Sequence, residues 1–199
     1  MPNSGNDHPN EVSTVAVAEG PSGRGPLHYL REAIKVARFD GEAIARVSQD
    51  RQALVYGAGI VAIGALPAVL WRSASGPVGD SPGGLGFSGI TGGLAWILLQ
   101  VMASAAQIAV IHGVAKLLFD ATGTYAGVLR VMWLGSIVSW LAIVPVLGSL
   151  VAGVWFLIIS LVTFEEVDGV ERLQGLILVV GLAAIMFLLS LMLASPVAR

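Results

Sequence analysis

Four long runs without a charged side chain constrain this sequence more than any other feature. Asp, Glu, Lys and Arg are absent from residues 52–71, 81–115, 131–164 and 173–198. A helix of about twenty apolar residues crosses the hydrocarbon core of a bilayer. Charged residues make up 12% of the chain, against about 25% in an ordinary soluble domain. The runs are continuously apolar rather than alternating, so they predict an all-α membrane protein.

The run over 131–164 is too long for a single crossing. As one helix it would measure about 50 Å, whereas the hydrocarbon core is about 30 Å thick. Pro145 and Gly148 lie near its middle, where a tight turn between two helices is expected. We therefore predict a third and a fourth span joined by a hairpin, and the alternative is a re-entrant hairpin.

The other runs complete a polytopic transmembrane helical bundle of about five spans. The first span is expected over residues 52–71 and the second over about 94–119. Residues 73–93 are rich in Gly, Ser and Pro and are expected to form the loop between them. The fifth span is expected over about 176–194.

Basic residues are distributed unevenly over the two sides of such a bundle. Nine Lys or Arg residues fall on the side of the N-terminus and two on the other. Cytoplasmic loops are enriched in Lys and Arg, so the N-terminus is expected in the cytoplasm and the C-terminus outside. The nine are Arg24, Arg31, Lys35, Arg38, Arg46, Arg51, Lys116, Arg130 and Arg172, and the two are Arg72 and Arg199.

The chain ahead of the first span divides into two parts. Residues 1–25 hold polar and acidic residues without the basic start and apolar core of a signal peptide, so we expect a disordered tail. Residues 26–51 predict an amphipathic juxtamembrane helix. Asp40 and Gly41 are expected to interrupt it, with Asp40 capping a second short helix. Residues 52–199 then form the five-span membrane domain.

The juxtamembrane helix combines an apolar stripe with an adjacent basic stripe. This pattern suits a helix that lies at the headgroups of an anionic leaflet. The alternative is a helix that packs against the cytoplasmic loops and leaves its basic face in water. The candidate lipid contacts are Arg31, Lys35 and Arg38.

No combination of residues indicates catalysis or cofactor binding. The chain has no cysteine, no phosphate-binding loop and three scattered histidines without ligand spacing, so we expect no metal, no cofactor, no enzymatic activity and no nucleic-acid binding. His112 is the one titratable residue expected inside a span. A histidine hydrogen-bonded to a neighbour is the expected role for it.

Two polar groups remain as candidate sites. Polar residues at positions i, i+4 and i+7 of the second span are expected to face the bundle interior, as a transport path or as a helix–helix contact. An acidic cluster after the fourth span is expected on the cytoplasmic side, as a solvated loop or as a docking surface for a basic partner. The polar stripe is Gln100, Ser104 and Gln107, and the acidic loop is Glu165, Glu166, Asp168 and Glu171.

Small residues one heptad or four positions apart mark helix faces that can approach a neighbour closely. Gly57 and Gly64 form one such pair, and Ser149 and Gly153 form another. The neighbour is a helix of the same chain or of a second copy, so a homo-oligomer is one expectation.

The segment from about 126 to 176 and its lead-in carry a distinctive set of motifs. These are Thr122-Gly123-Thr124-Tyr125 ahead of Leu129-Arg130, Pro145-x-Leu147-Gly148 at the turn, Trp155 in the fourth span, and Glu165 and Glu166 after it. With these motifs the segment resembles the Ypt/Rab-interacting-protein (YIP) membrane family, in particular its bacterial branch, which implies a location in a bacterial cytoplasmic membrane. The upstream segment 37–57, ARFDGEAIARVSQDRQALVYG, also resembles the lead-in of those proteins, and the likeness extends over about Leu27 to Leu193.

The resemblance implies a five-span domain with a cytoplasmic N-terminus. Eukaryotic members are associated with Rab GTPases and with vesicle formation or membrane shaping, but their short DLYGP motif is absent here, which argues against GTPase binding. We therefore expect a non-enzymatic scaffold, adaptor or membrane-organising protein. A small transporter, channel or lipid-moving protein that uses the polar stripe is the alternative.

Overall fold

A computed structural model describes residues 25–74, 89–144 and 147–194. In these ranges the chain is helical and forms no strand. The tail expected over residues 1–25 and most of the loop expected over 73–93 lie outside the described residues. The elements are α1 (Pro26–Ala37), α2 (Gly41–Gln49), α3 (Ala53–Ala74), α4 (Gly89–Phe119), α5 (Tyr125–Gly135), the 3₁₀ segment η1 (Ser136–Ile143), α6 (Leu147–Asp168) and α7 (Arg172–Ala194).

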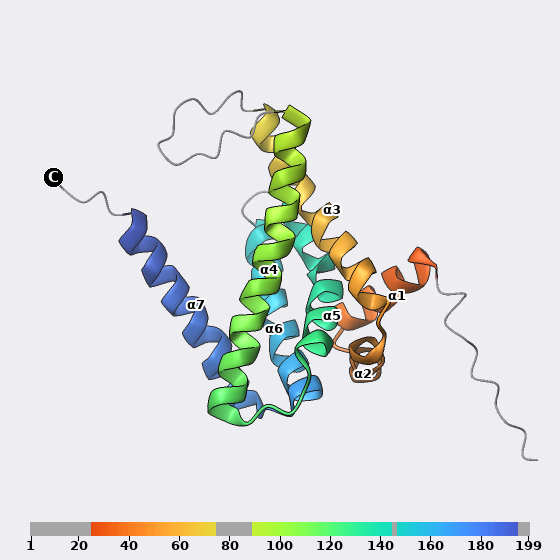
Figure 1. Cartoon of the computed structure of the whole chain (residues 1–199), viewed down its shortest axis with the longest axis vertical. Helices are drawn as coiled ribbons and strands as arrows, with labels where there is room; N and C mark the ends of the chain where they lie inside the picture. Colours follow the sequence, from red (N-terminus) through yellow and green to blue (C-terminus); the bar gives the residue numbers. More distant parts are fainter. Residues whose placement is uncertain (1–24, 75–88, 145–146, 195–199) are drawn as a thin grey trace, which may run out of the picture.

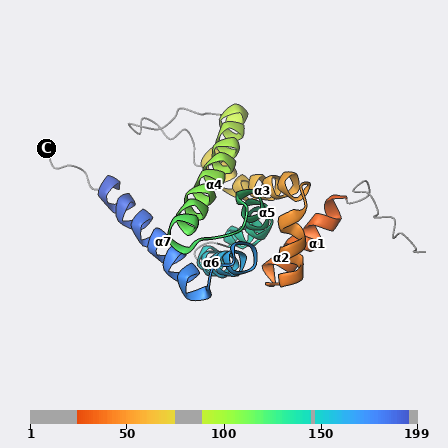
Figure 2. The ribbon, with the colours of Figure 1, turned by 60° about the horizontal axis from the view of Figure 1, so that its bottom comes forward.

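Helix α5 is the centre of the bundle. It packs against α1, α2, α3, α4 and α6, which surround it in Figures 1 and 2. Val131, Met132, Trp133 and Leu134 are consecutive and so point to all sides of the helix, and each of them is buried. A helix that is apolar on every side is stable only when other elements or lipid cover it completely. Here protein covers it.

Glycines set the distance between α3 and α5. A Cβ atom added to Gly57 would lie 2.8 Å from the Cβ of Trp133, and one added to Gly64 would lie 2.8 Å from Ser139 Oγ. The predicted small-residue face of the first span therefore packs within the chain. By contrast, a Cβ on Gly153 would meet nothing within 4 Å.

The structure confirms the hairpin predicted within residues 131–164. Helix α5 continues into η1, the chain turns, and α6 returns along it; a Cβ on Gly148 would collide with the carbonyl oxygen of Leu141. The first helix begins at Tyr125, six residues before the uncharged run. Arg130 therefore lies inside the helix. Its Nη1 donates to the carbonyl oxygen of Ser48 at 2.6 Å, so the guanidinium has a hydrogen-bond partner within the protein.

Three helical stretches among the described residues are long and apolar enough to cross a membrane. These are Gly92–Phe119, Tyr125–Ile143 and Leu147–Asp168, and shorter apolar stretches cover Ala53–Pro67 and Arg172–Gly181. The chain therefore has the helices of an integral membrane protein. Helix α4 begins at Gly89, five residues earlier than the sequence predicts. Its 31 residues span about 46 Å, longer than a bilayer core, which favours a tilted helix.

Helix α7 packs on α4 and α6 near its beginning, where Leu178 is buried. Beyond that point it runs away from the bundle in both views (Figures 1 and 2).

Helices α1 and α2 lie against the side of the bundle. The predicted break is confirmed: Asp40 is the N-cap of α2, and its Oδ1 accepts from the Ala43 N–H at 3.0 Å. Phe39 adopts a left-handed φ of 63°, and the Asp40 N–H donates to the Lys35 carbonyl oxygen, which closes the last turn of α1 as a Schellman motif. The Phe39 ring stacks on Trp155, whose Nε1–H donates to the carbonyl oxygen of Ala37 at 2.7 Å.

Gly57→Ala should destabilise the bundle by about 1–3 kcal/mol, because the added methyl group has to push α3 away from Trp133. Gly153→Ala is the matched control. It adds the same group to an open position of α6 and should be neutral or slightly stabilising. Thermal unfolding of both variants in detergent tests this prediction, and equal losses of stability would contradict it.

Candidate functional site

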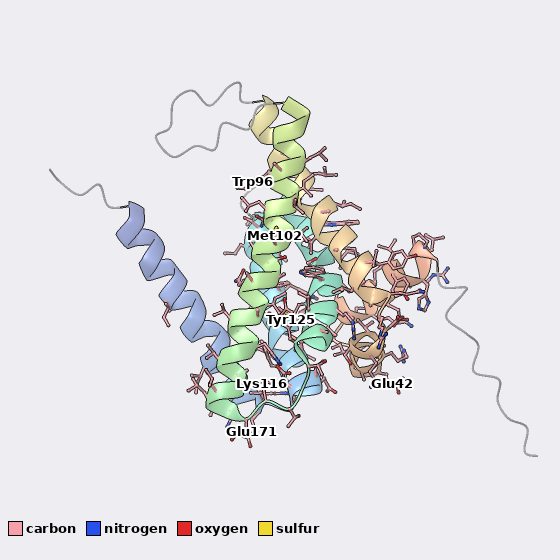
Figure 3. All side chains as sticks on the ribbon, in the orientation of Figure 1. Glu42, Trp96, Met102, Lys116, Tyr125 and Glu171 are labelled. Atoms are coloured by element: carbon pink, nitrogen blue, oxygen red, sulfur yellow. The ribbon has the colours of Figure 1, made fainter. Side chains whose placement is uncertain are left out.

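Two groups of polar residues stand out. One is a buried pair between α4 and α6, at the end of the bundle where these helices finish. The other is the charged surface of α1 and α2, on the side of the bundle. Figure 3 shows Lys116, Tyr125 and Glu171 at or near this end and Glu42 on the neighbouring helix α2. The buried pair was not predicted as a pair from the sequence.

The buried pair joins His112 of α4 to Asp168 of α6. His112 is 5% exposed and Asp168 is 1% exposed, and Nδ1 lies 3.0 Å from Oδ2. Since an ionised carboxylate can only accept, the pair favours the His112 tautomer that carries its proton on Nδ1. The expected structural role of His112 is confirmed. The sequence signal was weak, because the two residues are separated by 56 positions.

The connection between α4 and α5 closes over this pair. The Thr122 N–H donates to the backbone carbonyl oxygen of Asp168 at 3.0 Å, and a Cβ added to Gly123 would collide with Asp168 Oδ1. Thr124 then caps α5 by accepting from the Gly127 N–H at 3.2 Å. Thr122 thus supplies a hydrogen-bond donor, Gly123 a position without a side chain, and Thr124 the N-cap of α5.

One oxygen of the pair is left without a hydrogen bond. Asp168 Oδ1 is buried and has no donor within the described part of the chain, and the buried Arg130 Nε–H has no acceptor there. Unsatisfied buried polar atoms are uncommon in proteins and cost about 1–3 kcal/mol each. Their presence at one end of the bundle marks this region as a candidate functional site.

The acidic cluster differs from the prediction. Glu165, Glu166 and Asp168 belong to the last turns of α6 and not to a loop. Asp168 faces inward to His112, so it cannot be part of an acidic surface. Glu165 accepts from Arg172 Nε at 2.6 Å, and Glu166 and Glu171 are exposed. The helix extends beyond the uncharged run because its last residue, Asp168, is hydrogen-bonded to the buried His112.

The polar stripe is also divided. Ser104 is half-buried; its hydroxyl donates to the Val101 carbonyl oxygen and accepts from Trp133 Nε1 at 3.1 Å. Gln100 and Gln107 are exposed, so the prediction that all three face the bundle interior is wrong for these two. Helix α4 buries the side that carries Ile108 and Ala115, and the glutamines lie beyond the edge of that side.

The basic residues of α1 are exposed as a group, and the opposite side of the helix is buried. Two large apolar side chains lie among them: Leu27 is 71% exposed, and Ile34 is exposed as well. Tyr29 and Val36 are buried on the other side. The exposed cations are Arg31, Lys35 and Arg38.

One acid of α1 is buried against α2. Glu32 accepts from Lys35 at 2.7 Å and from Arg46 at 3.4 Å. Burial acts to raise the pKa of Glu32, but the hydrogen bonds and positive charges of Lys35 and Arg46 outweigh it, so its pKa lies below the ordinary value of 4.5. This ion pair fixes α1 to α2.

A small cavity of about 70 Å³ lies beside this ion pair, lined by His28, Tyr29, Glu32, Arg46, Val47 and Asp50. Pockets for small-molecule ligands measure about 300–1,000 Å³, so this one has room for water only. No group of three or more His, Cys, Asp or Glu side chains that could hold a metal ion occurs in the described ranges.

Comparisons of this chain with protein-family models, with curated proteins and with solved structures gave no match.

Loss of the imidazole at position 112 should destabilise the protein strongly. His112→Leu leaves a buried carboxylate without its partner, at a cost of about 3–5 kcal/mol. Adding Asp168→Asn to His112→Leu removes the unpaired charge and should recover part of the loss. A double-mutant cycle by thermal unfolding measures this coupling; additive losses would show that the two side chains do not interact.

The contribution of Glu32 should depend on pH. A carboxyl whose pKa is lowered by folding stabilises the folded state above its unfolded-state pKa, and this stabilisation disappears as the pH falls through the folded-state pKa. Glu32→Gln should therefore be less stable than the parent chain near neutral pH, and the difference should shrink below about pH 4.5. Unfolding temperatures of both proteins across this range test the prediction.

Proposed function

We propose that the chain is a five-span protein of the cytoplasmic membrane with its N-terminus in the cytoplasm. Helices α3 and α7 supply the first and fifth spans. One end of the bundle gathers α2, the α4–α5 connection and the α6–α7 connection, as Gly41 beside Glu166 and Thr122 bonded to Asp168 illustrate. Five spans with this orientation require these segments on the same, cytoplasmic side.

Its proposed function is to organise the membrane as a non-enzymatic scaffold or adaptor of the YIP type. The observation that carries this proposal is the exposed face of α1. Leu27 and Ile34 lie there among three cations, and the opposite face is fixed to α2, α5 and α6. Apolar side chains can enter the headgroup region while Lys and Arg extend to anionic phosphates.

The acidic end of α6 is the proposed contact for a protein partner. Glu166 and Glu171 are exposed there, and Glu165 already pairs with Arg172. This surface is smaller than the sequence predicts, because Asp168 does not contribute to it.

The transporter alternative has less support. A path through the single chain would need its polar groups inside the bundle, and two of the three residues of the stripe lie on the outside.

The lipid contact of α1 can be tested with a fluorophore. Because the chain has no cysteine, Leu27→Cys gives one labelling position for an environment-sensitive dye. In vesicles, rising anionic lipid should shift the emission to the blue. Arg31→Ala/Lys35→Ala/Arg38→Ala should abolish that response, since each cation contributes about 1 kcal/mol.

Arg172→Ala is the control for this experiment, because it removes an exposed cation outside α1. It should leave the response unchanged. A dye at position 27 that reports water at every lipid composition would overturn the proposal. The same vesicles can be assayed for lipid scrambling and ion leak, and flux above that of empty vesicles would favour the transporter.

A further inference from the structure

The outer face of α4 carries a heptad pattern that no helix among the described residues covers completely. Gln100, Ala103, Gln107 and Val110 are exposed and follow one another at spacings of three, four and three residues. One heptad after Val110, Leu117 is 84% exposed, whereas Val114 between them is half-buried. Spacings of this kind place side chains along one seam of a helix that packs against a parallel helix with a left-handed crossing.

Two members of this seam cannot be left facing lipid without cost. The amides of Gln100 and Gln107 make no hydrogen bond to any described residue. Each lies at least about 16 Å along the helix from either end of α4, well inside an apolar stretch that can cross the membrane. Hydrocarbon offers no donor or acceptor, so a partner helix has to supply them.

We propose that this seam binds a second copy of the chain, with α4 of one copy parallel to α4 of the other. Copies in one membrane share an orientation, so a two-fold axis along the membrane normal brings each seam residue opposite its equivalent. A glutamine amide both donates and accepts. Gln100 of one chain therefore bonds to Gln100 of the other, and Gln107 bonds to Gln107.

The remaining seam residues fit the same arrangement. Ala103 lies between the two glutamines and has a small side chain, which lets the two backbones approach. Val110 and Leu117 provide apolar contact toward the cytoplasmic end. A polar residue at a heptad core position also fixes the register of the two helices.

Disulfide crosslinking in vesicles tests the seam directly, because the parent chain contains no cysteine. Ala103→Cys should give an oxidised species of twice the monomer mass. Ala109→Cys is the matched control: it alters another exposed alanine of α4, away from the seam, and should remain monomeric. Equal crosslinking of the two variants, or none in either, would overturn the proposed interface.

The role of the amides is tested by fluorescence energy transfer between labelled copies diluted with lipid. Replacement of one glutamine by leucine should raise the dissociation constant of the dimer about threefold, and Gln100→Leu/Gln107→Leu should raise it about tenfold. Leu98→Ala, at an exposed position off the seam, should leave it unchanged. Undiminished association of the double variant would overturn recognition through the amides.

Discussion

The enclosure of α5 by protein on every side is the constraint on which the rest of the structure depends. Its apolar surface needs neighbours in all directions, and each neighbour is adapted to it: Gly57 brings α3 close, Gly123 opens the turn ahead of it, and Arg130 extends from it to α2. Helices α1 and α2 are part of this enclosure, since Val36 and Ile44 are completely buried. Residues 26–51 are therefore a wall of the bundle, and the exposed face of α1 is the proposed contact with lipid.

The helices could be predicted because charge is expensive in lipid, and a run without charge is visible in a single sequence. The hairpin within residues 131–164, the Asp40 cap and the Gly57 face followed from local rules of the same kind. Positions that depend on distant partners could not be predicted. Arg130 and Asp168 were expected outside the spans. Arg130 lies inside α5 and Asp168 is the last residue of α6, because their side chains bond to Ser48 and His112, which are distant in the sequence.

The candidate site was predicted less well for the same physical reason. The cations of α1 were identified from periodicity, and they are exposed as a group. The side of α4 that faces inward could not be derived from polarity alone, because a polar residue in a span needs a partner but the sequence does not say whether that partner belongs to the same chain. Gln107 and Ser104 carried the same signal and have different environments.

The Trp155 contact has a mechanical consequence. Its indole ties the end of α1 to α6 through a hydrogen bond and a stacked ring, and Phe39 holds a left-handed turn that few non-glycine residues adopt. The turn and the Trp155 contacts together hold the end of α1 against α6. Because α1 and α6 are joined at this point, neither helix can tilt without moving the other.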